Sequence, residues 1–472
     1  MTTPLTAAST RALDRATGSR PIPGNAVELL VDGPEAFPAM LAVIAGAERW
    51  IHFENYIIRS DATGWRFAEA LAAKARAGVR VRVLVDWFGS YGTRARYWRF
   101  LRAAGCEVRH FRPLSLGDPL VNLSRDHRKL VLADGRDAIV GGLCIGDEWA
   151  GDPAHEHLPW RDTALRVRGP AAAALDASFA RIWETTGGAL PDGERPGRIP
   201  ACGDAEVRVV AGVPGEARTY RLLTAVASAC AERLWVTDAY LAPPPPLRRA
   251  LIDAARDGCD LQLIVPGMSD IPFVRNLSRV GYRDLLAEGI RIFEWEGPML
   301  HAKTFVADGR LARIGSSNLN YASLLGNWEL DVLVDSPPLA LALEQRFRRD
   351  VLGSREVLRR MPQVPAPLRP LVPGRLERRE PEAAVGDHHV TLRERRRRAV
   401  ITLYSVAAGA SRSVFLPIFA AVLILAVLAF LLPRVVAVGT TLLMGWLTLS
   451  AARQLRRNHA PGVPPADWSR QA

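Results

Sequence analysis

The chain of 472 residues is too long for one ordinary domain, and its formal net charge of +12 invites an anionic partner. Five cysteines, odd in number and without Cys-x-x-Cys spacing, argue against a disulfide framework and a zinc site. Residues 353–472 hold 18 Arg against 7 Asp and Glu, which leaves about +1 for the first 352 residues. That near-neutral part argues against nucleic acid as the partner.

Residues 1–24 are predicted to be an N-terminal extension, and they lack the apolar stretch of a secretory signal. Apolar runs typical of strands then alternate with amphipathic runs typical of helices. The order occurs twice, with the strand-like runs AVELLVDG, RWIHFENYII, VRVRVLVDW and CEVRHFRP and then EVRVVAG, RLWVTDAYLA, CDLQLIVPG and IRIFEWEG. This repeat predicts an α/β fold of two pseudo-twofold-related domains, 25–200 and 201–360, each a mixed sheet flanked by helices.

The pattern changes after residue 360. Residues 361–398 are rich in Pro and Arg and are predicted to be a linker, followed by a membrane-associated region at 399–457 and a tail at 458–472. Val414–Leu432 and Val435–Ala452 are uncharged runs of 19 and 18 residues, close to the roughly 20 that a membrane span needs. Arginines on both flanks predict a transmembrane helical hairpin with both ends in the cytoplasm. A buried core helix is the alternative for either run alone.

Two matched His-x-Lys pairs carry the candidate chemistry. His127 and Lys129 recur as His301 and Lys303, 174 residues later. On a β-strand, residues two apart point to the same face, so each His is predicted to share a surface with its Lys. The chain has 58 Arg and only three Lys, and two of the three occupy these equivalent positions. A compact ammonium, which donates to a single phosphate oxygen, is a physical reason for choosing Lys there.

Each pair is followed by the same turn and the same small residues. An Asp-Gly step between two apolar runs predicts a β-hairpin, at Asp134-Gly135 and Asp308-Gly309. The returning strands end in small residues whose backbone N–H groups are expected to approach a phosphate. These are Gly141 and Gly142 in the first copy and Gly315 and Ser316 in the second.

The spacing His-x-Lys-x4-Asp-x6-Gly-(Gly/Ser) closely resembles that of the phospholipase D superfamily, over residues 25 to about 350. The segments 141–148 (GGLCIGDE), 159–162 (PWRD) and 315–318 (GSSN) look most like bacterial cardiolipin synthases. The resemblance implies two phospholipase D-like domains and one shared site that works without metal or cofactor. It also implies phospholipid substrates, phosphatidylglycerol above all, and catalytic domains on the cytoplasmic side of a bacterial inner membrane.

The same resemblance suggests roles for individual residues. His127 is expected to attack phosphorus and form a phosphohistidine, His301 to act as acid and base, and the two lysines to stabilise charge on the non-bridging oxygens. Asp162 and Glu329 match carboxylates that orient the histidines, with surface or salt-bridge carboxylates as the alternative. The sequence alone does not decide which His is the nucleophile.

Three further motif residues have expected roles. Asp134 and Asp308 are interpreted as turn formers rather than catalytic groups. Asn318 is expected to donate to a phosphate oxygen. At the equivalent place in the first copy the chain has Cys144, where the family usually has Asn, and a thiol is a weak donor. One phosphate contact is therefore in question.

Transfer of a phosphatidyl group to make cardiolipin is the leading hypothesis. Hydrolysis of phospholipid to phosphatidic acid and cleavage of nucleic-acid phosphodiesters are the enzymatic alternatives. A non-catalytic membrane scaffold that binds anionic lipid through the Arg-rich tail is the third possibility, favoured only by Cys144. The donor and acceptor lipids, the oligomeric state, and whether the hairpin spans or re-enters the membrane stay open.

Overall fold

The computed structural model describes residues 7–114, 121–152 and 157–358. The predicted linker, apolar hairpin and tail (361–472) lie outside these residues, so the transmembrane hairpin stays a prediction. Within the described ranges, no helix combines the length and the apolar character that crossing a membrane requires.

One mixed sheet of fifteen strands runs through both halves of the molecule. The first half contributes β1 (Ile22–Val31), β2 (Trp50–Asn55), β3 (Arg80–Asp86), β4 (Glu107–Phe111), β5 (Leu130–Ala133), β6 (Asp137–Gly141) and β7 (Thr163–Arg168). The second contributes β8 (Ala205–Gly212), β9 (Arg233–Thr237), β10 (Asp260–Pro266), β11 (Arg291–Trp295), β12 (Thr304–Ala307), β13 (Leu311–Gly315), β14 (Glu329–Asp335) and β15 (Ser354–Glu356).

The strand order confirms the repeat. From the central pair outward it reads β1-β7-β6-β5-β2-β3-β4 on one side and β8-β14-β13-β12-β9-β10-β11 on the other, with β15 at the far edge. Two separate sheets were expected. They are joined instead, because β1 pairs antiparallel with β8 through Ile22–Val207 and Asn25–Ala205.

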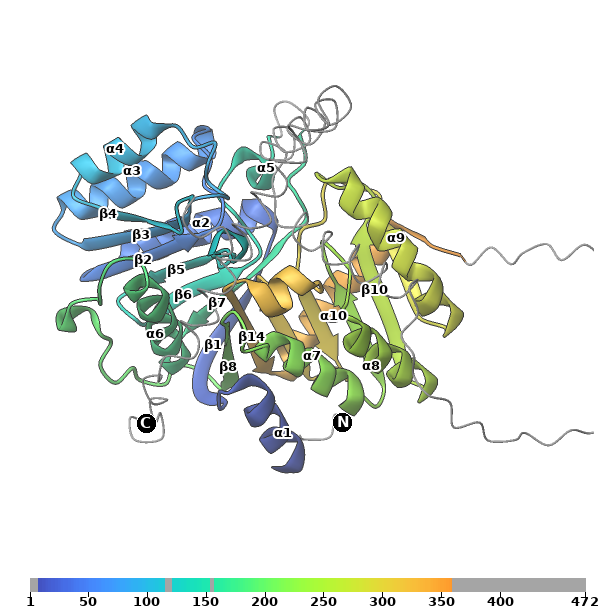
Figure 1. Ribbon diagram of the computed structural model, residues 1–472. Coiled ribbons are helices and arrows are strands. Elements are labelled where there is room, and N and C mark those ends of the chain that lie inside the picture. Colours follow the sequence, from blue (N-terminus) through green and yellow to red (C-terminus); the bar gives the residue numbers. More distant parts are fainter. Residues whose placement is uncertain (1–6, 115–120, 153–156, 359–472) are drawn as a thin grey trace, which may run out of the picture.

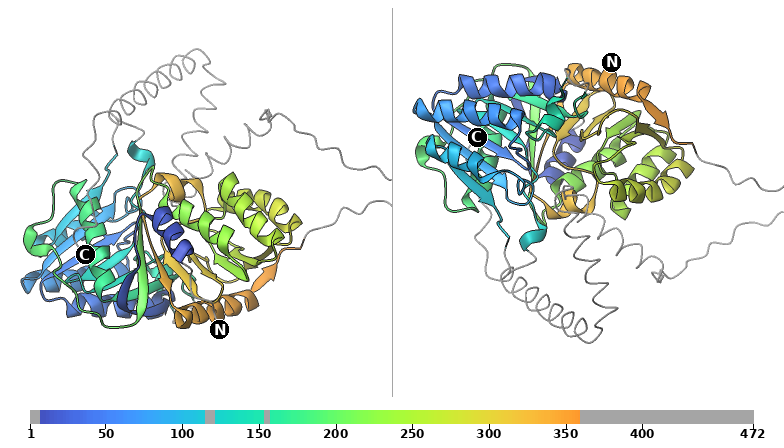
Figure 2. Two further views of the ribbon diagram at one scale, coloured as in Figure 1. Left: turned by 90° about the horizontal axis from the view of Figure 1, so that it is seen from below. Right: turned by 90° about the horizontal axis from the view of Figure 1, so that it is seen from above.

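Helices pack on both faces of the sheet, as Figures 1 and 2 show. The first half carries α2 (Asp32–Gly46), α3 (Ala62–Arg76), α4 (Ala95–Ala103), the short α5 (Asp147–Ala150) and α6 (Pro170–Glu184). The second carries α7 (Arg218–Ala229), α8 (Pro245–Arg256), α9 (Pro272–Ala287) and α10 (Pro337–Leu352). One core cluster joins residues of α6, α10 and strands of both halves, so the two halves share a hydrophobic core.

The N-terminal extension contains a helix, α1 (Ala7–Thr17), which packs on the second half rather than on the first. Leu13 is buried in the same cluster as Leu222 of α7. Asp14 pairs with Arg208 of β8 at 2.6 Å. The extension therefore contributes to the core of the second half.

The two Asp-Gly hairpins are confirmed. Asp134 and Gly135 have φ of 55° and 68°, and Asp308 and Gly309 have φ of 50° and 62°, as a tight turn between β5 and β6 or β12 and β13 requires. Each Asp carboxylate also accepts three backbone N–H groups, from residues 48–50 and 231–233, at 2.8–3.0 Å. The turns thus anchor the starts of β2 and β9, at the opposite strand ends from the His-x-Lys pairs.

Candidate functional site

The two His-x-Lys pairs lie in extended segments just before β5 and β12, not inside the strands as the pattern predicts. The difference arises because these segments bond to the other half of the molecule. The N–H of His127 donates to the carbonyl of Trp328 at 3.0 Å, and the N–H of His301 donates to the carbonyl of Arg161 at 2.7 Å. Each motif is therefore held against the partner half, and both lie at the boundary between the halves.

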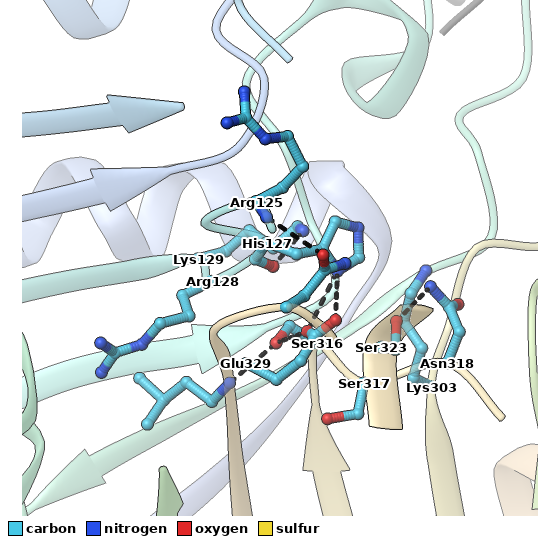
Figure 3. A network of polar contacts seen from close by, with 12 residues as sticks. Arg125, His127, Arg128, Lys129, Lys303, Ser316, Ser317, Asn318, Ser323 and Glu329 are labelled. Carbon is cyan, nitrogen blue, oxygen red and sulfur yellow. Dashed lines mark hydrogen bonds and ion pairs between the residues drawn. The ribbon is translucent and has the colours of Figure 1, made fainter. Parts of the chain in front are cut away.

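The carboxylates that contact the histidines are exchanged between the halves. Glu329, next to Trp328, lies 3.0 Å from Nδ1 of His127. Asp162, next to Arg161, lies 2.7 Å from Nδ1 of His301. Because Nδ1 of each ring meets a carboxylate, Nε2 is the nitrogen left for a substrate. Figure 3 shows Glu329 between His127 and Ser316, whose hydroxyl donates to the carboxylate at 2.5 Å.

Both lysines are buried, and each folds back onto its own motif. Lys129 is 2% exposed and its Nζ donates to the carbonyl of His127 at 2.5 Å. Lys303 is fully buried and donates to the carbonyl of His301. Their ammonium groups lie 5.1 Å from the ring of Tyr56 and 5.9 Å from the ring of Tyr240, respectively. Two buried cations thus sit beside the two imidazoles.

The lysines of both motifs affect each imidazole. Burial lowers the pKa of His127 well below its usual range, and the charges of Lys129 and of the distant-in-sequence Lys303 lower it further. Burial likewise lowers the pKa of His301 to about 3, with contributions from Lys303 and Lys129. Each imidazole therefore lies in the field of both ammonium groups, and both rings are neutral near pH 7.

The two carboxylates differ in their ionisation. Burial opposes charge on Asp162, but His301 and Lys303 lower its pKa below the usual value. Burial raises the pKa of Glu329 to about 8, despite the nearby Lys129. Asp162 is therefore ionised at neutral pH, whereas Glu329 is largely protonated. The two pairs of histidine and carboxylate, His127 with Glu329 and His301 with Asp162, are therefore similar in geometry but differ in charge.

The small residues at the ends of β6 and β13 make room for carboxylates. A Cβ on Gly142 would overlap Oδ1 of Asp162, and one on Gly315 would overlap Oδ1 of Asp331. Gly141 meets the backbone of β7 in the same way. The N–H groups of Gly142 and Ser316 donate to Thr163 (3.0 Å) and Leu330 (3.1 Å), so they bond to neighbouring strands rather than approach a phosphate. These two N–H groups are therefore not available to a phosphate, contrary to the prediction from the sequence.

Gly142→Ala is expected to lower kcat/KM by about 10²-fold, because the new methyl group would push Asp162 away from His301. Gly46→Ala is the matched control, since a Cβ on Gly46 meets nothing within 4 Å. Purified variants should be compared by initial rates and by thermal unfolding. A Gly142→Ala variant that keeps wild-type activity would contradict this reading of the glycine.

Asn318 and Cys144 occupy equivalent positions and are both buried. Nδ2 of Asn318 lies 3.4 Å from Oγ of Ser323, and its Oδ1 has no partner among the described residues. Burial raises the pKa of the Cys144 thiol, although Lys129 and Lys303 are close enough to oppose the shift. Both side chains thus line the site, and a role for Asn318 toward phosphate stays a prediction.

Of the aromatic side chains around the histidines, only Trp160 belongs to a segment that the sequence motifs include. Tyr56 meets the His127 ring edge-on, at 4.9 Å between centroids. Trp149, Trp160 and Tyr240 surround His301 at centroid distances of 5.6, 5.8 and 6.2 Å. Their positions in the repeat could have indicated Tyr56 and Tyr240, because each follows a repeated strand, β2 or β9. Among the described residues, no group of three or more His, Cys, Asp or Glu side chains is arranged to hold a metal ion.

Comparisons with known proteins agree with this architecture. A family model described as the PLD-like domain of cardiolipin synthase matches residues 40–183 and 222–351. A cardiolipin synthase of Geobacillus kaustophilus is 37% identical over 314 residues, which are 65% of this chain and 62% of that protein. One of Listeria welshimeri is 31% identical over 338 residues, 70% of each chain. The chain thus spans slightly less than two thirds of the Geobacillus relative.

A solved structure extends the comparison of the fold. The crystal structure of a phosphatidylserine synthase of Haemophilus influenzae matches with a TM-score of 0.58 and 14% identity. The match covers 74% of this chain and 92% of the other. At that identity the likeness concerns the fold alone.

Proposed function

The chain belongs to the phospholipase D-like family of cardiolipin synthases, and from this membership we propose that it transfers phosphatidyl groups between lipid alcohols through a phosphohistidine. The specific reaction proposed is cardiolipin synthesis from two molecules of phosphatidylglycerol. The observation that carries the proposal is the pair of buried His–Lys motifs, each with its carboxylate supplied by the other half. Such a site has two imidazoles for a two-step transfer and two ammonium groups that stabilise the negative charge of the phosphate oxygens.

In the first proposed step, Nε2 of His127 attacks phosphorus, and the bond from phosphorus to the glycerol oxygen breaks. His301 gives its proton to that oxygen, and glycerol leaves. In the second step, His301 takes the proton from the hydroxyl of a second phosphatidylglycerol. That oxygen attacks phosphorus, the bond to His127 breaks, and cardiolipin is released.

The charges of the site favour this sequence of events. A nucleophilic imidazole must be neutral, and the pKa of His127 lies well below its usual range because of burial and the two lysines. Burial is the main cause of the low pKa of His301, and the charges of Lys303 and Lys129 lower it further. An anionic phosphodiester between the two lysines would offset those charges. Substrate binding is thus expected to help His301 hold the proton that the leaving group needs, with ionised Asp162 at 2.7 Å from its Nδ1.

Exposed apolar side chains near the motifs support a lipid substrate at a membrane. Leu123 and Leu158 stand four residues before His127 and Asp162 and are 55% and 70% exposed. Met268, after β10, is 60% exposed. Together with the apolar runs of the tail, they suit an enzyme on the cytoplasmic face of a bacterial inner membrane.

Product analysis with defined lipids tests the proposed function. The full chain in vesicles of phosphatidylglycerol should yield cardiolipin and glycerol in equal amounts, and His127→Ala should yield neither. Phosphatidic acid without cardiolipin would identify a phospholipase D instead. Vesicles of phosphatidylcholine alone are the control for the donor headgroup.

The rate is expected to fall as the pH rises above about 8. Burial lowers the pKa of Lys303 to about 8, and the nearby charge of Lys129 contributes, so deprotonation above that pH removes one cation from the site. The pH profile of kcat/KM should therefore show an alkaline limb. Lys303→Arg should lower the rate but remove the limb, because Arg stays protonated.

Glu329→Gln controls this assignment, since burial also raises the pKa of Glu329 to about 8. The alkaline limb should persist in Glu329→Gln. A limb that disappears in Glu329→Gln and persists in Lys303→Arg would assign the titration to the carboxyl group and contradict the prediction.

A further inference from the structure

Two cysteines that are 29 residues apart in the sequence meet in the second half of the molecule. Cys230 directly follows α7, and Cys259 directly precedes β10. Their Sγ atoms lie 2.9 Å apart. A disulfide bond holds two sulfurs at about 2 Å, so forming one here needs a movement of only about 1 Å.

The surroundings distinguish the two thiols. Cys259 is 5% exposed, whereas Cys230 is half-buried and is therefore the sulfur that a small molecule in solution reaches first. Sγ of Cys230 also donates to Oδ1 of Asp308 at 3.2 Å, which fixes the side chain in place. The hydrogen bond with Cys230 lowers the pKa of Cys259, which favours the thiolate there.

The first half of the molecule provides an internal comparison. Arg233 pairs with Asp260 across β9 and β10 as Trp50 pairs with Arg80 across β2 and β3. This register makes Ala47 and Val79 the equivalents of Cys230 and Cys259. Both are buried apolar residues, 2% and 8% exposed. The fold therefore accommodates small apolar side chains at these two positions, and sulfur is not needed there for packing.

We propose that Cys230 and Cys259 are a redox-sensitive site that closes to a reversible disulfide in the presence of a small disulfide oxidant such as glutathione disulfide. The hydrogen bonds with Cys259 and Asp308 raise the pKa of Cys230, so Cys230 passes its proton to the Cys259 thiolate, 2.9 Å away, as it attacks one sulfur of the oxidant. A mixed disulfide forms, and the glutathione thiolate that leaves takes the proton from Cys259. The Cys259 thiolate then attacks the Cys230 sulfur and releases the second thiol. The protein loses two electrons and two protons, and the oxidant takes them up as two thiols.

The cross-link stabilises the second half without reaching the catalytic groups. It joins the starts of β9 and β10 and encloses α8 in the loop. His301 lies at the other end of β9, since β12 begins opposite Thr237, the last residue of that strand. The separation along the strand is about 15 Å. Oxidation is therefore expected to raise the thermal midpoint by about 5 °C and to leave the transfer rate within about twofold.

The test uses the full chain, treated with glutathione disulfide, alkylated and digested with trypsin. Cleavage after arginine places the two cysteines in peptides 222–233 and 257–275. The expected result is one cross-linked pair of these peptides, removed by dithiothreitol. Glutathione attached to Cys230 without the cross-link, or a cross-link to the exposed Cys202, would overturn the proposal.

The double variant Cys230→Ala, Cys259→Val copies the first half and serves as the matched control. Its thermal midpoint should equal that of the reduced wild-type protein and should not rise when glutathione disulfide is added. An equal rise in the double variant would also overturn the proposal. Peptide mapping of the wild-type chain tests for the cross-link even if the double variant folds poorly.

Discussion

His127→Ala is expected to lower kcat/KM by at least about 10³-fold with every phosphatidyl donor, because no other group replaces the attacking nitrogen. His301→Ala should be as damaging with phosphatidylglycerol, whose alkoxide leaves poorly without a proton. With a phosphatidyl ester of p-nitrophenol the two variants should separate. The phenolate leaves unprotonated, so His301→Ala should release it rapidly whereas His127→Ala should not.

The measurement is the release of nitrophenol in the first turnover, followed by absorbance. Rapid release by His127→Ala and slow release by His301→Ala would reverse the two roles. Equal losses with both donors would mean that neither histidine serves mainly as the acid. Thermal unfolding of each variant checks that the buried ring was removed without loss of the fold.

Asp162→Asn is expected to lower kcat/KM at pH 7 by about 10²- to 10⁴-fold. The fall in kcat/KM caused by Glu329→Gln should be smaller by a factor of at least about ten. Asp162 is ionised because His301 and Lys303 lower its pKa against the effect of burial, so the amide removes a charge that stabilises the imidazolium. Glu329, with its pKa raised by burial to about 8, is largely protonated, and Gln copies it closely.

Asp137→Asn is the matched control for both changes. Asp137 pairs with Arg166 at 2.7 Å on the same sheet but is partly exposed and contacts neither histidine. Its loss should leave kcat/KM within about twofold, as expected for a surface ion pair. Equal losses in Asp162→Asn and Glu329→Gln would contradict the unlike ionisation of the two carboxyl groups.

The parts of the fold that depend on local pattern could be predicted from the sequence. The short apolar runs predicted the strands, and the Asp-Gly steps predicted both hairpins, because a tight turn needs residues that tolerate positive φ. The repeated order of elements predicted two related halves, and the strand order of the sheet is symmetric accordingly. The His–Lys pairs were found in the same way, from two residues of unusual type at equivalent positions.

Contacts between distant residues could not be predicted from such patterns. Glu329 and His127 are 202 residues apart, and Asp162 and His301 are 139 apart, so no local rule assigns each carboxylate to the imidazole of the other half. The prediction that each motif lies on a strand was wrong, because the backbone N–H groups of His127 and His301 bond to the other half of the molecule. The meeting of Cys230 and Cys259 likewise depends on the parallel pairing of β9 and β10.

The most direct test of the account is to locate the phosphatidyl group on the enzyme during turnover. The full chain should be mixed with radiolabelled phosphatidylglycerol, quenched under alkaline conditions that preserve phosphohistidine, digested and analysed by mass spectrometry. The adduct is predicted on His127, with Nε2 as the modified nitrogen because Nδ1 faces Glu329. An adduct on His301, or turnover that continues with label on neither ring, would contradict it.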